Sequence, residues 1–255
     1  MNTDPQLFSE LGYVVLPRVF SADEMSRMRA AALEHASHVG DILSHPELAP
    51  IVYDDRILSA LRSLGIWPAR YFGDSNVSFL TGPYGFHRDN TDRGDPNAPD
   101  WQTAEYPIVR IAIYLQDYSS HGGGLEVLPQ SHQQCDGPFA PAVYLNSGLG
   151  DLVIWNLRTF HSGFGGRHLP PQPLPRVALF LAYGLPGAAT NRYLAFLKTR
   201  TYQFEIWSNS LYRRSTVLEA ERRGLLVRDL RADLEGVPGL GRHAGYVPLP
   251  YDPPA

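Results

Sequence analysis

Three residues with metal-binding side chains are the most informative feature of the chain: His87, Asp89 and the distant His161. On an extended strand, residues i and i+2 point to the same side, so His87 and Asp89 can face one ion while Arg88 faces away. Two imidazoles and one carboxylate hold Fe(II) in non-haem oxygenases and leave coordination positions open for a co-substrate and O2. The same ligands also suit catalytic zinc. The spacing therefore predicts a metal enzyme, with redox chemistry as the leading hypothesis.

The part of the chain before these residues is predicted to be mostly helical. Ser21 and Glu24 have the spacing of a capping box, and the apolar residues after them predict a helix over about residues 22–36. Residues 12–17 form a short apolar run bounded by glycine and proline, which predicts a buried strand leading into that helix. Apolar residues three to four positions apart predict a second helix near residues 54–64.

From about residue 70 the pattern is typical of β structure. Strands are predicted at residues 76–81, 107–115, 124–128, 151–155 and 176–184, separated by turns that contain glycine and proline. Short strands at this spacing favour a sandwich or a barrel. The polar segment 90–106 follows the candidate ligands directly, and a long irregular loop inside a compact domain is usually functional. We expect this loop to border the site and to choose the substrate.

The 255 residues are expected to form one domain, because all-β domains of this length are often single. A helical N-terminal part over about residues 1–68 precedes a β core over about 70–185. A helical C-terminal extension follows over about 200–255, with Val217, Leu218, Leu225, Leu226 and Leu230 as candidate apolar contacts.

Four motifs resemble the phytanoyl-CoA dioxygenase family. They are GYVVLP at residues 12–17 before a capped helix, FHRD at 86–89, GGLEVLPQSH at 123–132, and GD at 150–151 leading to His161. They occur in the family's order across about residues 8–184. The resemblance implies a mainly β fold with flanking helices around a double-stranded β-helix, the jelly roll of the cupins. It also implies that His87, Asp89 and His161 bind Fe(II) and that the enzyme uses 2-oxoglutarate and O2.

The family also places an arginine shortly after the second histidine to hold the far carboxylate of 2-oxoglutarate, and Arg176 fits that role. Independently of the family, an arginine at the start of an apolar strand needs an anion, and a carboxylate accepts its planar fork through two hydrogen bonds. A salt bridge to an acidic residue of the protein is the alternative. The fifteen residues from His161 to Arg176 exceed the family's usual spacing, and Arg167 is a rival anchor.

Arg110 lies in an apolar strand-like run, where an inward charge is costly unless it is paired. We expect it to contact 2-oxoglutarate or an anionic substrate, with solvent or a protein acid such as Glu105 or Asp117 as the alternative. Further candidates for substrate contact are chosen by proximity to the motifs, although core packing explains Trp155 almost as well. They are Asn76, Tyr84, Arg88, Asn90, Trp155 and Asn156.

The resemblance implies oxidative decarboxylation of 2-oxoglutarate to succinate and CO2, followed by hydroxylation of an unactivated C–H bond. Halogenating relatives carry a small residue in place of the carboxylate ligand, so Asp89 disfavours halogenation, whereas desaturation, ring closure and epoxidation stay open. A zinc or manganese hydrolase or isomerase on the same fold is a second hypothesis, and a non-catalytic cupin-like binding protein is a third. A small metabolite or natural-product intermediate is the expected substrate.

Composition narrows the function further. The net charge of −4 and the lack of a basic block argue against a nucleic-acid surface. Cys135 is the only cysteine, so there is no disulfide within the chain, and a reducing cytoplasm is the expected location. The sequence contains neither a secretory signal pattern nor 18 consecutive apolar residues, so we expect no membrane association. The oligomeric state is left open.

Overall fold

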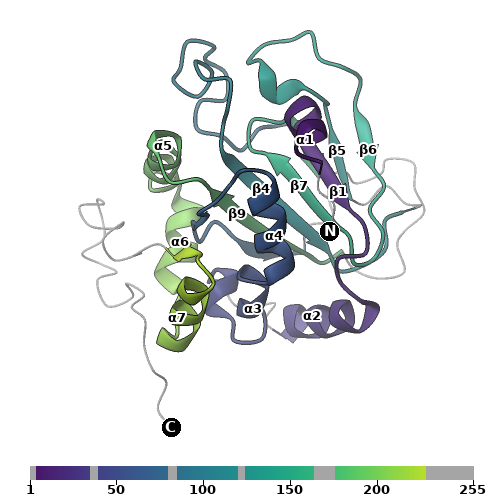
Figure 1. The fold of residues 1–255 in the computed structure, drawn as a ribbon, viewed down its shortest axis with the longest axis vertical. Helices are drawn as coiled ribbons and strands as arrows, with labels where there is room; N and C mark the ends of the chain where they lie inside the picture. Colours follow the sequence, from purple (N-terminus) through teal and green to yellow (C-terminus); the bar gives the residue numbers. More distant parts are fainter. Residues whose placement is uncertain (1–3, 35–39, 80–84, 120–123, 164–175, 228–255) are drawn as a thin grey trace.

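The computed structural model describes residues 4–34, 40–79, 85–119, 124–163 and 176–227. Two β-sheets form its core, and helices cover the outer face of the larger sheet (Figure 1). The larger sheet has the order β1-β7-β4-β9-β2-β10, and β3 pairs with the first three residues of β9. The smaller sheet has the order β6-β5-β8. All pairings are antiparallel except that of β10 with β2.

The strands of the larger sheet are β1 Tyr13–Leu16, β2 Arg70–Tyr71, β3 Asn76–Ser78, β4 Ile108–Tyr114, β7 Leu152–Asn156, β9 Ala178–Gly184 and β10 Leu226–Val227. Those of the smaller sheet are β5 Leu125–Val127, β6 Val143–Leu145 and β8 His161–Gly163. The helices are α1 Pro5–Leu11, α2 Ala22–Glu34, α3 Ala49–Val52, α4 Asp55–Ser63, α5 Ala188–Leu197, α6 Thr201–Asn209 and α7 Arg214–Arg222. Two short 3₁₀ turns span Ile42–Ser44 and Ser131–Gln133.

Successive side chains of β4 point alternately into two separate layers of the core. Ile111 and Ile113 join the large apolar cluster between the larger sheet and the helices, whereas Ala112 and Tyr114 join a smaller cluster between the two sheets. Because successive side chains of a strand point to opposite faces, Arg110 belongs to the face of β4 that is turned toward the smaller sheet. The strand pattern therefore places one arginine between the two sheets.

The N-terminal predictions from the sequence are confirmed. In the capping box, Ser21 donates its backbone N–H to Glu24 Oε2 at 2.8 Å, and Glu24 donates its own to Ser21 Oγ at 3.3 Å. Helix α2 follows directly, although residues 35 and 36 of the predicted helix lie outside the described residues. The strand predicted at 12–17 is β1, and the helix predicted near 54–64 is α4.

Each of the five strands predicted after residue 70 has a counterpart in the two sheets, whereas the short strands β2, β6, β8 and β10 were not predicted. At the C-terminal end, α5 begins at Ala188, earlier than the sequence suggested. Leu225 is buried there, but Leu218 and Leu226 are exposed, and Leu230 lies outside the described residues. Among the described residues, no helix is both long and apolar enough to cross a membrane.

Candidate metal centre

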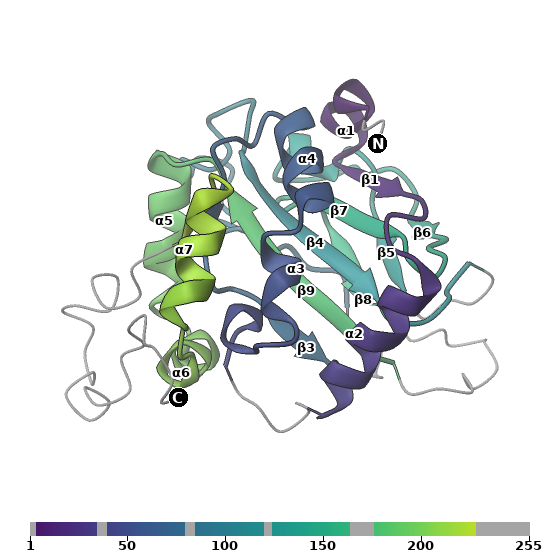
Figure 2. The same ribbon diagram turned by 60° about the horizontal axis from the view of Figure 1, so that its bottom comes forward.

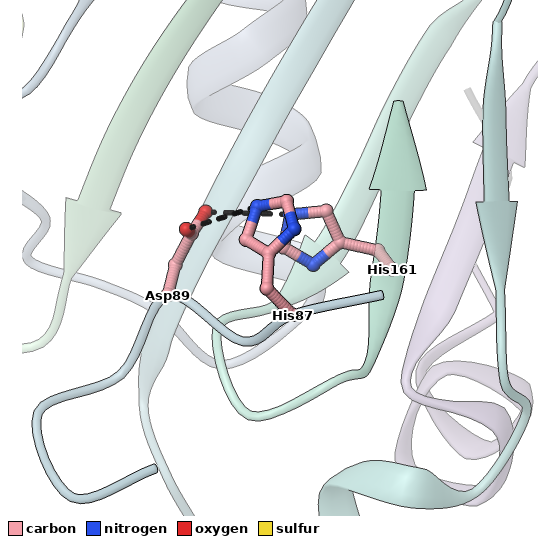
Figure 3. Close-up of side chains that lie close together, drawn as sticks. All are labelled: His87, Asp89 and His161. Carbon is pink, nitrogen blue, oxygen red and sulfur yellow. Dashed lines mark ion pairs between the residues drawn. The ribbon is translucent and has the colours of Figure 1, made fainter. Parts of the chain in front are cut away.

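A short backbone bridge brings the two predicted histidine ligands together. The backbone N–H of His87 donates to the carbonyl of His161 at 2.9 Å, and the N–H of His161 donates to the carbonyl of His87 at 2.9 Å. Asp89 extends the pairing, because its N–H donates to the carbonyl of Leu157 at 3.0 Å. The segment with His87 and Asp89 thus runs beside the start of β8, and Figure 3 shows the three side chains pointing toward one another.

Ligand-type atoms of His87, Asp89 and His161 all lie within 4.8 Å of one another. The Nε2 atom of His87 lies 3.8 Å from Asp89 Oδ1, and that of His161 lies 3.6 Å from Asp89 Oδ2. The other ring nitrogens are oriented by the backbone, since His87 Nδ1 lies 3.0 Å from Gly85 O and His161 Nδ1 lies 3.0 Å from Thr159 O. With Nδ1 protonated, each Nε2 lone pair is directed at the shared position, as in proteins that bind metals through histidine.

The electrostatics of the three residues favour a bound cation. Burial lowers the pKa of His161 to about 4, against the attraction of Asp89, so this imidazole is neutral at pH 7. Burial alone would raise the pKa of Asp89, but the attraction of Arg110, His161 and His87 outweighs it and holds the pKa well below the usual range. One charged carboxylate and a neutral imidazole are the protonation states that a divalent metal requires.

Arg110 connects Asp89 to a second buried carboxylate. Its Nε lies 3.2 Å from Asp89 Oδ2, and its Nη2 donates to Asp74 Oδ2 at 2.6 Å and to the hydroxyl of Tyr193 at 3.3 Å. The hydroxyl of Tyr193 also donates to Asp74. The contact with Asp89 is an ion pair without the alignment of a hydrogen bond, because Arg110 Nε has no hydrogen-bond acceptor in the described structure. Arg110 is thus paired with acidic residues, the alternative considered from the sequence.

The three candidate ligands line a pocket of about 300 Å³. Arg176 lines the same pocket from the residues just before β9, with its Cζ 5.5 Å from the ring centroid of Tyr114. Trp155 lies beside His161, with the ring centroids 5.2 Å apart. The other lining residues are Asp74, Asn76, Ser78, Arg110, Leu125, Gly163, Phe180, Arg200 and Tyr202. The pocket therefore combines the metal-binding side chains with three arginines and an apolar wall.

Three of the proposed substrate residues do not line this pocket. The guanidinium of Arg88 is buried and donates to five backbone carbonyls, including those of Arg158 at 2.8 Å and Cys135 at 2.7 Å, so it faces away from the metal ligands as the strand period predicted. Asn90 is buried and donates to Asp100, and Asn156 donates to the carbonyl of Tyr106. Their side chains hold neighbouring loops in place. Tyr84 and Arg167 lie outside the described residues.

The loop at residues 90–106 contributes no residue to the lining of the pocket. Its buried Asp100 instead accepts hydrogen bonds from Arg192, and its backbone at Asp100 and Thr103 accepts from Arg158. The described pocket therefore does not support the expectation that this loop borders the site, although the charge of Arg93 contributes to lowering the pKa of Asp89. Sequence reasoning missed Arg200 and Tyr202, which reach the pocket from the start of α6, because no spacing links them to the metal motif.

No protein-family model matches the chain, and no curated protein matches it in sequence. Solved structures do match the fold. The non-heme alpha-ketoglutarate-dependent carbocyclase SnoK from nogalamycin biosynthesis is 24% identical, with a TM-score of 0.55 over 71% of this chain and 82% of that chain. HygX from Streptomyces hygroscopicus, crystallised with nickel, 2-oxoglutarate and hygromycin B, is 18% identical, with a TM-score of 0.56 over 71% of this chain and 85% of that chain.

EctD from S. alaskensis, crystallised with 2-oxoglutarate and 5-hydroxyectoine, is 19% identical, with a TM-score of 0.54 over 71% of this chain and 74% of that chain. At these identities the likeness concerns the fold. It confirms the predicted class, which is a mainly β jelly-roll core with flanking helices. The chain therefore has the fold of several non-haem enzymes that use 2-oxoglutarate.

Proposed function

We propose that the protein is an Fe(II)- and 2-oxoglutarate-dependent dioxygenase that hydroxylates an unactivated C–H bond of a small metabolite or natural-product intermediate. The observation that carries the proposal is the convergence of His87, Asp89 and His161 on one point of a pocket that Arg176 also lines. Solved enzymes of the same fold support the choice of metal and co-substrate: SnoN is crystallised with Fe3+ and alpha ketoglutarate, and HygX is crystallised with iron and, separately, with nickel and 2-oxoglutarate.

The side chains fit the proposed iron. Two imidazole nitrogens and one carboxylate oxygen lie close enough together to bind one ion, and three protein ligands would leave coordination positions open for the co-substrate and O2. His161 is buried and Asp89 is largely so, whereas the side chain of His87 is 42% exposed. Access to the iron would therefore be from the side of His87. Bound iron with 2-oxoglutarate and O2 supplies oxidative decarboxylation to succinate and CO2 and the oxidising power to remove a hydrogen atom from carbon.

Arg176 is the residue that we assign to the far carboxylate of 2-oxoglutarate. Its guanidinium lies over the ring of Tyr114, a cation–π contact that limits its rotamers at the edge of the pocket that it lines. Arg110 is less suited to this role, because Asp74 and Asp89 already match its charge. We assign Arg110 instead to holding the carboxylate of Asp89 in place.

The apolar lining determines where a substrate can sit. Leu125, Trp155 and Phe180 form a wall beside the metal ligands that excludes water and packs against a carbon skeleton. Positioning by this wall decides which hydrogen faces the iron. The carboxylate of Asp89 fills the position that must be vacant for halide, so hydroxylation is favoured over halogenation. A reducing cytoplasm is the proposed location, in keeping with the buried free thiol of Cys135.

The test is anaerobic titration of the Fe(II)-loaded protein with 2-oxoglutarate, followed by exposure to air. Chelation of 2-oxoglutarate to iron is expected to give a visible metal-to-ligand charge-transfer band, and air is expected to give succinate and O2 uptake. Zn(II)-loaded protein is the control and should do neither. No band together with no 2-oxoglutarate-dependent O2 uptake would refute the dioxygenase and leave the zinc or manganese enzyme or the binding protein.

A further inference from the structure

Arg200 is a cation of the pocket for which the described residues provide no counter-ion. It lies just before α6, partly buried, with its Cζ 5.6 Å from the ring centroid of Phe196. No described acidic side chain forms an ion pair with it, although Arg110 in the same pocket forms two. The four internal segments outside the described residues contain no Asp or Glu in their sequences, and the acidic residues outside the described part are Asp229, Asp233, Glu235 and Asp252 of the C-terminal segment.

The formal charges of the described lining side chains leave a surplus of one positive charge. Asp74 and Asp89 supply two negative charges, whereas Arg110, Arg176 and Arg200 supply three positive charges. A divalent metal and the dianion 2-oxoglutarate add no net charge when they bind together. The loaded pocket therefore keeps one positive charge. Trp155 adds an unpaired donor, because its buried Nε1 has no acceptor among the described residues.

Arg200 and Arg176 reach the pocket from different places. Arg176 precedes β9 and lies next to Tyr114. It is four residues before Phe180, which is a distance of roughly 13 Å along an extended chain. Phe180 is paired in register with Asn76 of β3, and the Asn76 amide donates to the hydroxyl of Tyr202 at 3.1 Å. Arg200 is therefore on the side of the pocket that is formed by α6 and β3, two elements that Figure 2 shows in the same part of the molecule.

We propose that Arg200 binds a carboxylate of the primary substrate, so that the substrate is a small carboxylic acid whose apolar body packs against Trp155, Phe180 and Tyr202. This inference rests on the proposed function, which assigns Arg176 to 2-oxoglutarate. One carboxylate balances the surplus charge of the loaded pocket and accepts the planar guanidinium fork through two hydrogen bonds. A neutral substrate would leave the guanidinium covered and unpaired, which is costly.

The experiment compares two probes of nearly the same shape, phenylacetate and its neutral amide phenylacetamide. Each is titrated by calorimetry into the anaerobic Fe(II)-loaded protein with saturating 2-oxoglutarate. Phenylacetate is expected to bind wild type about tenfold more tightly than phenylacetamide, since a carboxylate forms charge-assisted hydrogen bonds with a guanidinium whereas an amide forms weaker neutral-acceptor ones. Arg200→Gln should remove this preference and weaken the binding of phenylacetate far more than that of phenylacetamide. Arg200→Lys should keep part of the preference, because lysine has the positive charge but not the planar guanidinium that forms two hydrogen bonds.

Two further variants locate the effect. Arg214→Gln removes an exposed arginine at the start of α7 and should bind both probes like wild type. Arg176→Gln should weaken 2-oxoglutarate while it keeps the preference for phenylacetate. Loss of the preference in Arg176→Gln but not in Arg200→Gln would overturn the assignment, as would equal affinity of wild type for the two probes or no measurable binding of phenylacetate.

Failure of the inference and failure of the proposed function give different results. A protein that forms the charge-transfer complex with 2-oxoglutarate but does not distinguish the probes refutes the role of Arg200 alone. A protein that forms no such complex refutes the dioxygenase. In that second case the calorimetric titration is repeated with Zn(II)-loaded protein, and a preference for phenylacetate that depends on Arg200 still supports an anion site at this position.

Discussion

The guanidinium of Arg110 lies against the carboxylate of Asp89, with 3.2 Å between Nε and Oδ2. Because its Nη2 is held by Asp74 at 2.6 Å and by the hydroxyl of Tyr193, Arg110 is itself fixed in place and fixes the orientation of Asp89, a proposed metal ligand. Partners of this kind control metal affinity without touching the metal. Arg110 is thus a positioning residue in our proposal.

Replacing Arg110 with glutamine is expected to lower Fe(II) affinity by about 10- to 100-fold, the usual effect of losing such a partner. Competition with a chromophoric chelator under anaerobic conditions measures this affinity. Since Arg110→Gln alone leaves Asp74 buried and unpaired, Arg110→Gln/Asp74→Asn serves as the charge-balanced variant that protects the fold. Unchanged iron affinity in a folded double variant would refute the positioning role.

His161→Ala is expected to abolish iron retention, because it removes one of three ligands from a site with no substitute imidazole in reach among the residues that the structure describes. The matched control is His132→Ala, which also removes a buried imidazole, but one that is not a candidate metal ligand and whose Nε2 lies 3.0 Å from the carbonyl of Ser9. Metal content after gel filtration measures retention. We expect the control to lose stability and keep its iron. Equal iron loss in both variants would indicate a general effect of unfolding.

Arg88→Met is expected to destabilise the protein by on the order of 4 kcal/mol, since several buried carbonyls lose a charged donor at once. Arg88 is 2% exposed, and its Cζ also lies 3.8 Å from the ring centroid of Phe160. Urea unfolding measures the loss, with Arg222→Met on the exposed surface of α7 as control. A change below about 1 kcal/mol, within the range of surface substitutions, would contradict the role of Arg88 as a structural anchor.

Local rules predicted those parts of the site that depend on a single strand. The two-residue period placed His87 and Asp89 together and turned Arg88 away, and the structure has this arrangement. The approach of His161 depends on a backbone bridge between segments more than seventy residues apart, which no local pattern encodes. Order along the chain and the family resemblance supplied that pairing.

The remaining lining residues could not be predicted, because their position follows from how distant elements pack. Arg200 and Tyr202 reach the pocket through the docking of α6, and the sequence near them has no feature of a site. The loop at 90–106 shows the opposite error. A polar, proline-containing segment has the same composition whether it faces a substrate or binds arginines of the protein itself, as Asp100 binds Arg158 and Arg192.

Asp41 gives the protein a predictable dependence of stability on pH. Its side chain is fully buried, with Oδ2 accepting from the hydroxyls of Tyr71 and Tyr212 and Oδ1 accepting from the backbone N–H of Ser44 at 3.1 Å. Burial raises the pKa of Asp41 to about 6 from an ordinary 3.8, although these hydrogen bonds oppose the rise. The folded protein therefore binds a proton at pH values where the unfolded chain does not.

Because the folded state binds more protons between these two pKa values, the contribution of Asp41 to stability increases as the pH falls from about 6 toward 4 and is lost as the pH rises through 6. Relative to Asp41→Asn, wild type should gain about 2 kcal/mol of unfolding free energy between pH 7 and pH 4. Urea unfolding of both proteins across this range measures the difference, in which titrations common to the two cancel. A difference that does not vary with pH would show that Asp41 titrates alike in the folded and unfolded states.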